Sequence, residues 1–184
     1  MGSKERGFVV WLTGLPASGK TTIARKLEKE LRERGLKVEV LDGDEVRRWL
    51  SPEAGFSRED RERHLRRVAY VSHLLARNGV VVIASFVSPY RSTRDFARQL
   101  IGDFVEVYVK CSLETCMKRD PKGLYHKALA GEIKDMTGIQ DPYEEPLSPE
   151  VVVDSERESP DECAKRIMAK LLRLGYIKGE EIEH

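Results

Sequence analysis

The sequence predicts an α/β fold in which helices cover both faces of a five-stranded parallel sheet. Three observations support this prediction. Short apolar runs of strand length alternate along the chain with segments whose apolar residues recur at helical spacing. The first of these runs, residues 8–13, leads directly into a glycine-rich loop that opens a helix. The run at residues 80–84 is apolar on both faces, as expected of a central parallel strand.

The first half of the chain contains two predicted strands and three predicted helices. Residues 8–13 form the first strand, and residues 23–31 carry the apolar stripe of the helix that follows. Residues 37–41 form the second strand, and a short helix carries the apolar positions of residues 46–50. The third helix spans residues 57–78, between an S-x-x-D capping pattern at its start and a glycine after its end.

The second half continues this alternation after the strand at 80–84. A helix covers about residues 92–100, residues 104–109 form the fourth strand, and a short helix covers residues 112–119. Residues 151–153 form the fifth strand. The last helix covers residues 159–172, and its opening Ser-Pro-Asp-Glu combines an N-cap, a proline at the first helical position and a glutamate at the third.

A phosphate-binding motif, G-x-x-x-x-G-K-T, connects the first strand to the first helix. Its backbone N–H groups converge on phosphate oxygens, its lysine reaches the β- and γ-phosphates, and its threonine hydroxyl ligates Mg²⁺. The motif gives the fold its P-loop NTPase type. We expect Lys20 to act on the phosphates with no role in the core. The predicted ATP-binding residues of this loop are Gly14, Leu15, Pro16, Ala17, Ser18, Gly19, Lys20, Thr21 and Thr22.

An acidic turn and a group of arginines follow the second strand. Asp42 and Asp44 flank a glycine at the carboxyl edge of the sheet, where they could orient a hydroxyl, accept its proton or hold Mg²⁺. They could equally form a turn and an N-cap for the next helix. Most of the arginines fit solvated helix faces, but Arg47 and Arg61 could clamp an anionic second substrate. Phe56, in the loop between them, could stack on a base or simply pack.

Residues 120–149 interrupt the alternation. This segment is rich in proline, glycine and charge, and it shows little apolar periodicity. A segment of this length is either a functional lid or a disordered insert, and a phosphoryl-transfer site favours a lid because it must exclude water. We expect the lid to exchange its amide hydrogens rapidly without ligands and slowly when both substrates are bound.

Composition excludes several classes of function. The formal net charge of +1 disfavours a nucleic-acid partner, and no apolar run reaches the length that a membrane span needs. The three cysteines are odd in number and lack C-x-x-C spacing, so they predict buried thiols in a reducing compartment. We therefore expect one cytoplasmic kinase domain over residues 1–184, with the lid at about 120–149 and no nucleic-acid or membrane partner.

Taken together, these residues resemble one family, the adenylyl-sulfate kinases, from about residue 7 to residue 153. The phosphate loop is shared by many kinases, whereas the serine–proline–tyrosine turn and the lid strings are more specific. The resemblance rests on Gly14 to Thr22, Leu41-Asp42-Gly43-Asp44, Gly55-Phe56-Ser57, Asp60-Arg61, Arg66-Arg67, Ala84 to Arg91, Arg119 to Tyr125, Ala130 to Lys134, Thr137-Gly138-Ile139 and Asp141-Pro142-Tyr143.

The resemblance implies ATP and adenosine 5′-phosphosulfate as substrates, Mg²⁺ as cofactor, and a homodimer as the family expectation. Phe56 would stack on the acceptor adenine, while Arg47, Arg61 and Lys122 would hold its phosphosulfate. Asp42 and Asp44 would act near the acceptor hydroxyl and Mg²⁺, with Lys20 as a further catalytic residue. Arg119 would cover the ATP base. The other acceptor-site residues implied are His64, Phe86, Val87, Ser88, Met136 and Thr137.

Three of these positions carry particular expectations. Ser88 matches a serine described in the family as a phosphoserine intermediate, although direct in-line transfer needs no covalent step and Ser88 could merely shape a turn. His64 stands where the family usually has asparagine, and its ring can still donate one hydrogen bond. Met136 replaces the lid phenylalanine that would sandwich the adenine against Phe56. A thioether in place of this ring predicts a weaker contact with the adenine.

Two alternatives remain at this point. The chain could be a kinase for another small anionic acceptor, such as a nucleoside monophosphate or a sugar acid, or a non-catalytic nucleotide-binding switch. The residues by themselves predict a kinase with an anionic acceptor, and the sulfate enters only through the resemblance.

Overall fold

The computed structural model describes residues 6–179 and contains the predicted parallel sheet. The sheet has the order β2-β3-β1-β4-β5, and every neighbouring pair is parallel. Its strands are β1 (Val9–Thr13), β2 (Val38–Asp42), β3 (Val81–Ser85), β4 (Phe104–Lys110) and β5 (Val151–Asp154). The predicted fold class is confirmed. Because β1 is central, the phosphate loop that follows it lies at the middle of the sheet's carboxyl edge.

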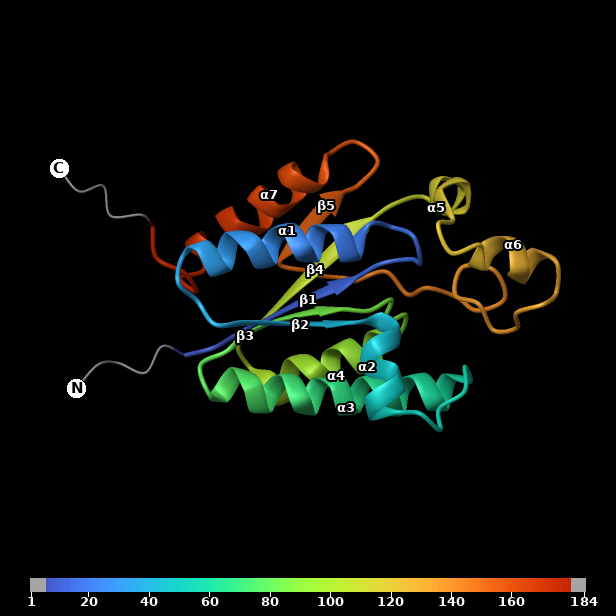
Figure 1. Cartoon of the computed structure of the whole chain (residues 1–184), viewed down its shortest axis with the longest axis horizontal. Coiled ribbons are helices and arrows are strands. Elements are labelled where there is room, and N and C mark those ends of the chain that lie inside the picture. The colour runs from blue at the N-terminus through green and yellow to red at the C-terminus, as the bar shows by residue number, and fades with distance from the viewer. Residues whose placement is uncertain (1–5, 180–184) are drawn as a thin grey trace.

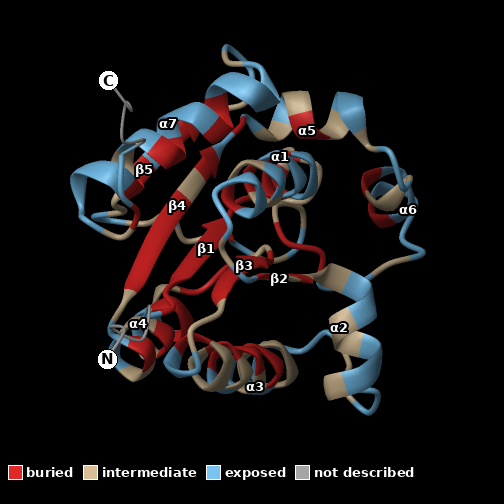
Figure 2. Ribbon diagram, turned by 60° about the vertical axis from the view of Figure 1, so that its left-hand side comes forward, coloured by how far each residue is buried: buried red, intermediate tan, exposed pale blue. Residues whose placement is uncertain are grey.

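Helices cover both faces of the sheet, as Figure 1 shows. One layer holds α1 (Lys20–Glu33) and α7 (Pro160–Arg173), and the other holds α3 (Arg58–Arg77) and α4 (Arg91–Ile101). Each layer closes its own apolar core against the sheet. The strands are therefore buried along most of their length, whereas the outward faces of the helices remain exposed (Figure 2).

Three short helices lie toward the carboxyl edge of the sheet. They are α2 (Gly43–Leu50), α5 (Leu113–Arg119) and α6 (Leu124–Leu129). Helices α5 and α6 extend beyond the two layers, at the end of the molecule opposite the described chain ends (Figure 1). The loops that can form a site therefore gather at this end.

The predicted helix starts are present, with one difference at α3. Ser159 and Glu162 form a complete capping box at α7. At α3 the Ser57 hydroxyl accepts from the Asp60 N–H, but the Asp60 carboxylate accepts from the Gly55 N–H at 3.0 Å instead of the Ser57 N–H. Asp60 therefore shapes the loop that carries Phe56.

Residues 120–149 form a helix and contribute to an apolar cluster, and their sequence pattern predicts neither feature. They contain α6, which the sequence did not predict, and they contribute Tyr125, Ala128 and Met136 to a third apolar cluster with Cys111 and Cys116. The weak apolar periodicity of the segment did not reveal this cluster, because Cys111 and Cys116 lie outside the segment. All three cysteines are buried free thiols. Within residues 6–179, no helix is long and apolar enough to cross a membrane.

Candidate active site

The phosphate loop has the tight backbone that its glycines predict. A Cβ at Gly14 would lie 2.6 Å from the Val109 carbonyl oxygen, so no larger residue fits there without movement. Gly19 has a φ of 99° and Ala17 a φ of 64°, both in the left-handed region. Helix α1 begins at Lys20, directly after Gly19, so the loop and the positive end of the helix dipole meet at the same point.

Lys20 lies inside this loop. Its residue is 8% exposed, and its ammonium donates to the carbonyl oxygens of Gly14 at 3.0 Å and Leu15 at 2.8 Å. Lys20 belongs to none of the three apolar clusters, but it is bonded to the loop's own backbone, a contact that the sequence did not predict. Burial lowers the pKa of Lys20 to about 8, although the neighbouring Cys116 and Asp42 oppose this shift. Burial in the folded loop therefore makes the Lys20 ammonium easier to deprotonate, although a phosphate ligand favours the charged form.

This lowered pKa predicts that ATP binding depends on pH. Above pH 8 the free protein holds Lys20 increasingly as the neutral amine, whereas the phosphates favour the ammonium. The affinity for ATP should then fall by up to about tenfold per pH unit, and binding should take up a proton. Calorimetry at pH 7 to 9, in buffers with different ionisation enthalpies, measures both effects. An affinity that stays constant over this range would contradict the prediction.

The acidic turn lies at the end of β2. Asp42 occupies the N-cap position of α2, but within the described residues its carboxylate makes no capping hydrogen bond. Asp44, in the first turn of α2, is paired with Lys122, whose Nζ lies 3.2 Å from its Oδ2. The structure thus brings together these two predicted site residues, one on α2 and one in the lid, and among the described residues it leaves the Asp42 carboxylate free to act on a ligand.

Arg47, predicted to hold the phosphosulfate, lies against Phe56, predicted to stack on the adenine. The Arg47 guanidinium carbon lies 4.7 Å from the centroid of the Phe56 ring, and the same guanidinium donates to the Gly55 carbonyl. Phe56 is 58% exposed. Arg47 holds this ring in place on one side. The exposed surface that Arg47 does not cover is available to stack on a base.

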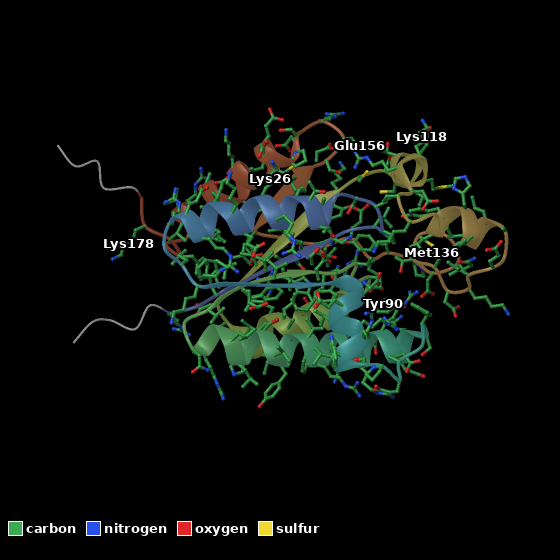
Figure 3. All side chains as sticks on the ribbon, viewed as in Figure 1. Lys26, Tyr90, Lys118, Met136, Glu156 and Lys178 are labelled. Atoms are coloured by element: carbon green, nitrogen blue, oxygen red, sulfur yellow. The ribbon has the colours of Figure 1, made fainter. Side chains whose placement is uncertain are left out.

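Arg61 joins α3 to the lid. Its guanidinium donates to Thr137 Oγ1 at 3.1 Å and to Asp141 Oδ2 at 2.9 Å, and also to the Asp135 carbonyl. The Tyr90 hydroxyl donates to the same Asp141 oxygen at 2.9 Å. Figure 3 shows Tyr90 at the α2–α3 side of this region and Met136 in the lid. The arginine predicted to bind an anionic substrate thus holds an aspartate of the lid, a partner that sequence reasoning missed.

Ser88 is enclosed in a tight turn after β3. It is 2% exposed with a φ of 42°, its hydroxyl donates to the Phe86 carbonyl at 3.1 Å, and Trp11 Nε1 donates to it at 3.0 Å. Phe86 packs against Trp11, and the Val87 carbonyl accepts from the Thr13 hydroxyl at 2.8 Å. These contacts are those of a residue that shapes a turn. A phosphorylated Ser88 would require this turn to open.

The lid contacts the phosphate loop from the other side. The Tyr125 hydroxyl donates to the Pro16 carbonyl at 2.7 Å. Met136 is 6% exposed and packs in the third apolar cluster with Tyr125, so a contact with an adenine would require its thioether to leave that cluster. Thr137 is buried beneath Arg61. The lid is therefore attached to both the phosphate loop and α3, and hydrogen exchange with and without the two substrates measures its predicted mobility.

Arg119 lies at the end of α5, beside the loop between β5 and α7. Its guanidinium donates to the Ser155 carbonyl at 2.8 Å and to the Ser155 hydroxyl at 3.2 Å. The Ser155 Cβ lies 3.8 Å from where a Cβ on Gly19 would stand, so this loop borders the phosphate loop. Glu156, labelled near Lys118 in Figure 3, accepts from the N–H and hydroxyl of Ser112. No motif in the sequence marked this loop as part of the site.

The predicted metal ligands fit Mg²⁺. Thr21 is exposed in the first turn of α1, and Asp42 ends β2 at the carboxyl edge of the sheet, the edge from which the phosphate loop also starts. No group of three His, Cys, Asp or Glu residues in the described chain could hold a metal by itself. Mg²⁺ is usually bound by one or two protein oxygens together with substrate phosphates and water, so this sparse set is sufficient.

Comparison with known proteins identifies the family. The family model described as adenylylsulphate kinase matches residues 6–154. The adenylyl-sulfate kinase of Picosynechococcus is 53% identical over 174 residues, which cover 95% of this chain and 98% of that protein. A probable adenylyl-sulfate kinase of Pyrococcus abyssi is 56% identical over 171 residues, covering 93% and 98% of the two chains.

A solved structure agrees with this relationship. The Mycobacterium tuberculosis APS kinase, determined in complex with AMPPNP and APS, is 42% identical to this chain with a TM-score of 0.87. The match covers 90% of this chain and 98% of that one. Since the family model and close relatives both match nearly the whole chain, this protein belongs to the adenylyl-sulfate kinase family.

Proposed function

We propose that this protein transfers the γ-phosphoryl group of ATP to the 3′-hydroxyl of adenosine 5′-phosphosulfate, giving 3′-phosphoadenosine 5′-phosphosulfate for sulfate assimilation. The observation that carries this proposal is that the phosphate loop and the Arg47–Phe56 pair both lie at the carboxyl edge of the sheet. The chain is also 53% identical to an adenylyl-sulfate kinase. The first element suits ATP, and the second suits an anionic nucleotide acceptor.

The ATP site is built on β1, α1 and the neighbouring loops. The backbone N–H groups of residues 14–22 surround the phosphates, and the Lys20 ammonium exchanges its carbonyl partners for phosphate oxygens. Arg119, held by Ser155 beside the phosphate loop, would cover the ATP base. Thr21, assisted by Asp42, would hold Mg²⁺, which would supply positive charge next to the transferring phosphoryl group.

The acceptor site is built on α2, α3 and the loop between them. Phe56 stacks on the adenine, and Arg47 and Arg61 hold the phosphosulfate. Asp44 and Lys122, paired at 3.2 Å, lie at the mouth of the site. Asp42 is the carboxylate available to orient the 3′-hydroxyl and accept its proton as the oxygen attacks the γ-phosphorus.

The lid connects the two substrate sites. Tyr125 attaches it to the phosphate loop, and Asp141 attaches it to Arg61 of the acceptor site. Because Arg61 contacts Asp141 of the lid and, in this proposal, also the acceptor anion, acceptor binding and lid position are coupled. A closed lid over both substrates would exclude the water that otherwise hydrolyses ATP.

An acceptor assay with ATP and Mg²⁺ tests this function. We expect turnover with adenosine 5′-phosphosulfate and little turnover with AMP, with gluconate or without acceptor. ATP consumption that does not depend on any acceptor would favour a nucleotide switch. Equal turnover with AMP would leave only the more general assignment of a kinase with an anionic acceptor.

A further inference from the structure

A buried polar chain joins the end of α2 to the middle of α3, behind the acceptor site. Ser51, which is 1% exposed, directly follows α2, and its hydroxyl lies 2.8 Å from Nδ1 of His64 on α3. Arg67, one turn further along α3, donates to the same Ser51 hydroxyl at 3.1 Å and to the Leu50 carbonyl at 2.9 Å. Three side chains thus form one continuous chain, Arg67 to Ser51 to His64.

This chain determines which His64 nitrogen carries the hydrogen. Ser51 Oγ already accepts a hydrogen from Arg67, which has no acceptor atom to offer in return. If Nδ1 also donated to Ser51, the single hydroxyl hydrogen would be buried without an acceptor among the described residues, which is unfavourable. If Ser51 donates to Nδ1, the Arg67 N–H, the Ser51 hydroxyl and the His64 Nδ1 are all paired. His64 then carries its hydrogen on Nε2.

The free nitrogen of His64 lies at the acceptor site. Among the described residues Nε2 has no hydrogen-bond partner, yet it keeps contact with solvent although the residue is only 4% exposed. The Phe86 ring packs edge-on against the imidazole, with the centroids 5.9 Å apart, and restricts its rotation. His64 follows Arg61 by three residues on α3, so the two side chains lie on neighbouring positions of one helix face.

We infer that Ser51 and Arg67 are positioning residues that fix the Nε2–H tautomer of His64, so that this N–H donates a hydrogen bond to an anionic oxygen of the acceptor's phosphosulfate. This inference rests on the proposed acceptor. A neutral donor has an advantage beside two arginines, because it adds a hydrogen bond without adding a third positive charge. Burial, together with Arg47 and Arg67 and against the weaker effect of Glu53, lowers the pKa of His64 to about 4, so the ring is neutral near pH 7.

The tautomer can be measured directly. In the ligand-free protein labelled with ¹⁵N-histidine, Nδ1 of His64 should resonate as an unprotonated, pyridine-type nitrogen and Nε2 as a protonated, pyrrole-type nitrogen. The chain has four histidines, and loss of one signal set in His64→Gln assigns the resonances. In Ser51→Ala the tautomers should mix. A parent protein with the hydrogen on Nδ1, or an unchanged tautomer in Ser51→Ala, would overturn the inference.

Steady-state kinetics then separate positioning from simple support of the fold. Ser51→Ala should raise the acceptor KM by about three- to tenfold, as expected for one lost hydrogen bond, with kcat and the ATP KM nearly unchanged. His64→Leu should do the same, and His64→Gln should keep most of the affinity because its amide nitrogen can replace Nε2. Ser72→Ala, which removes another buried hydroxyl of α3 that bonds only to the Val68 carbonyl, is the matched control and should change none of these constants.

The outcomes are distinct. A lower melting temperature for Ser51→Ala with an unchanged acceptor KM would mean that the chain only joins α2 to α3, and the positioning role would be rejected. If the parent phosphorylated a different acceptor, the proposed function would fail, but the tautomer measurement needs no acceptor and would still decide whether the chain fixes the ring.

Discussion

Replacement of Lys20 by alanine is expected to lower kcat/KM for phosphoryl transfer by about 10³-fold or more. The reason is electrostatic, because the ammonium is the charge that the phosphate loop directs at the β- and γ-phosphates. The fold should survive. The carbonyls of Gly14 and Leu15 lose a donor, but the cost of burying a charge is removed as well, so the melting temperature should change by no more than about 4 °C.

Lys26→Ala is the control for this variant. Lys26 lies on the same helix but points to solvent, where its Nζ is 3.4 Å from Asp161 in an exposed pair that contributes little to stability (Figure 3). Its loss should leave both turnover and melting temperature almost unchanged. Transfer by Lys20→Ala within a few-fold of the parent would show that the phosphate loop is not the donor site.

Replacement of Arg61 by alanine is expected to raise the acceptor KM strongly and to leave the ATP KM nearly unchanged. Loss of a charged, forked contact costs on the order of 2–4 kcal/mol, which corresponds to tens- to hundreds-fold in kcat/KM. The structure adds a second effect. Without Arg61, Asp141 and Thr137 lose the guanidinium that holds this part of the lid, so its amides should exchange faster in the ligand-free variant.

Two further variants make this test specific. Arg61→Lys should restore only part of the activity, because a point charge cannot contact Thr137, Asp141 and the Asp135 carbonyl in the same plane. Arg63→Ala removes an exposed arginine of the same helix that pairs only with Asp60, at 3.4 Å, and should change little. If Arg61→Ala weakened ATP instead of the acceptor, the assignment of the two sites would be reversed.

The sequence by itself determined the fold class, and it predicted the donor loop and the location of the acceptor site. These features depend on local patterns in the sequence. Neighbouring residues determine the strand and helix periods, the spacing of G-x-x-x-x-G-K-T and the cap at Ser159. Asp42 and Asp44 could be placed at the sheet edge because the carboxyl ends of parallel strands meet there. All five predicted strands are present.

Only the tertiary structure decided how the site residues are held. Arg61 and Asp141 are 80 residues apart in the chain, Trp11 and Ser88 are 77 apart, and no local period relates such positions. The apolar cluster of the lid could not be predicted for the same reason, because Met136 and Tyr125 pack with Cys111, which follows β4, and with Cys116 of α5. The burial of Lys20 and the pairing of Ser51 with His64 likewise depend on which segments the fold brings together. The sequence specified which chemical groups are present, and the packing of distant segments determined their partners, their charge and their orientation.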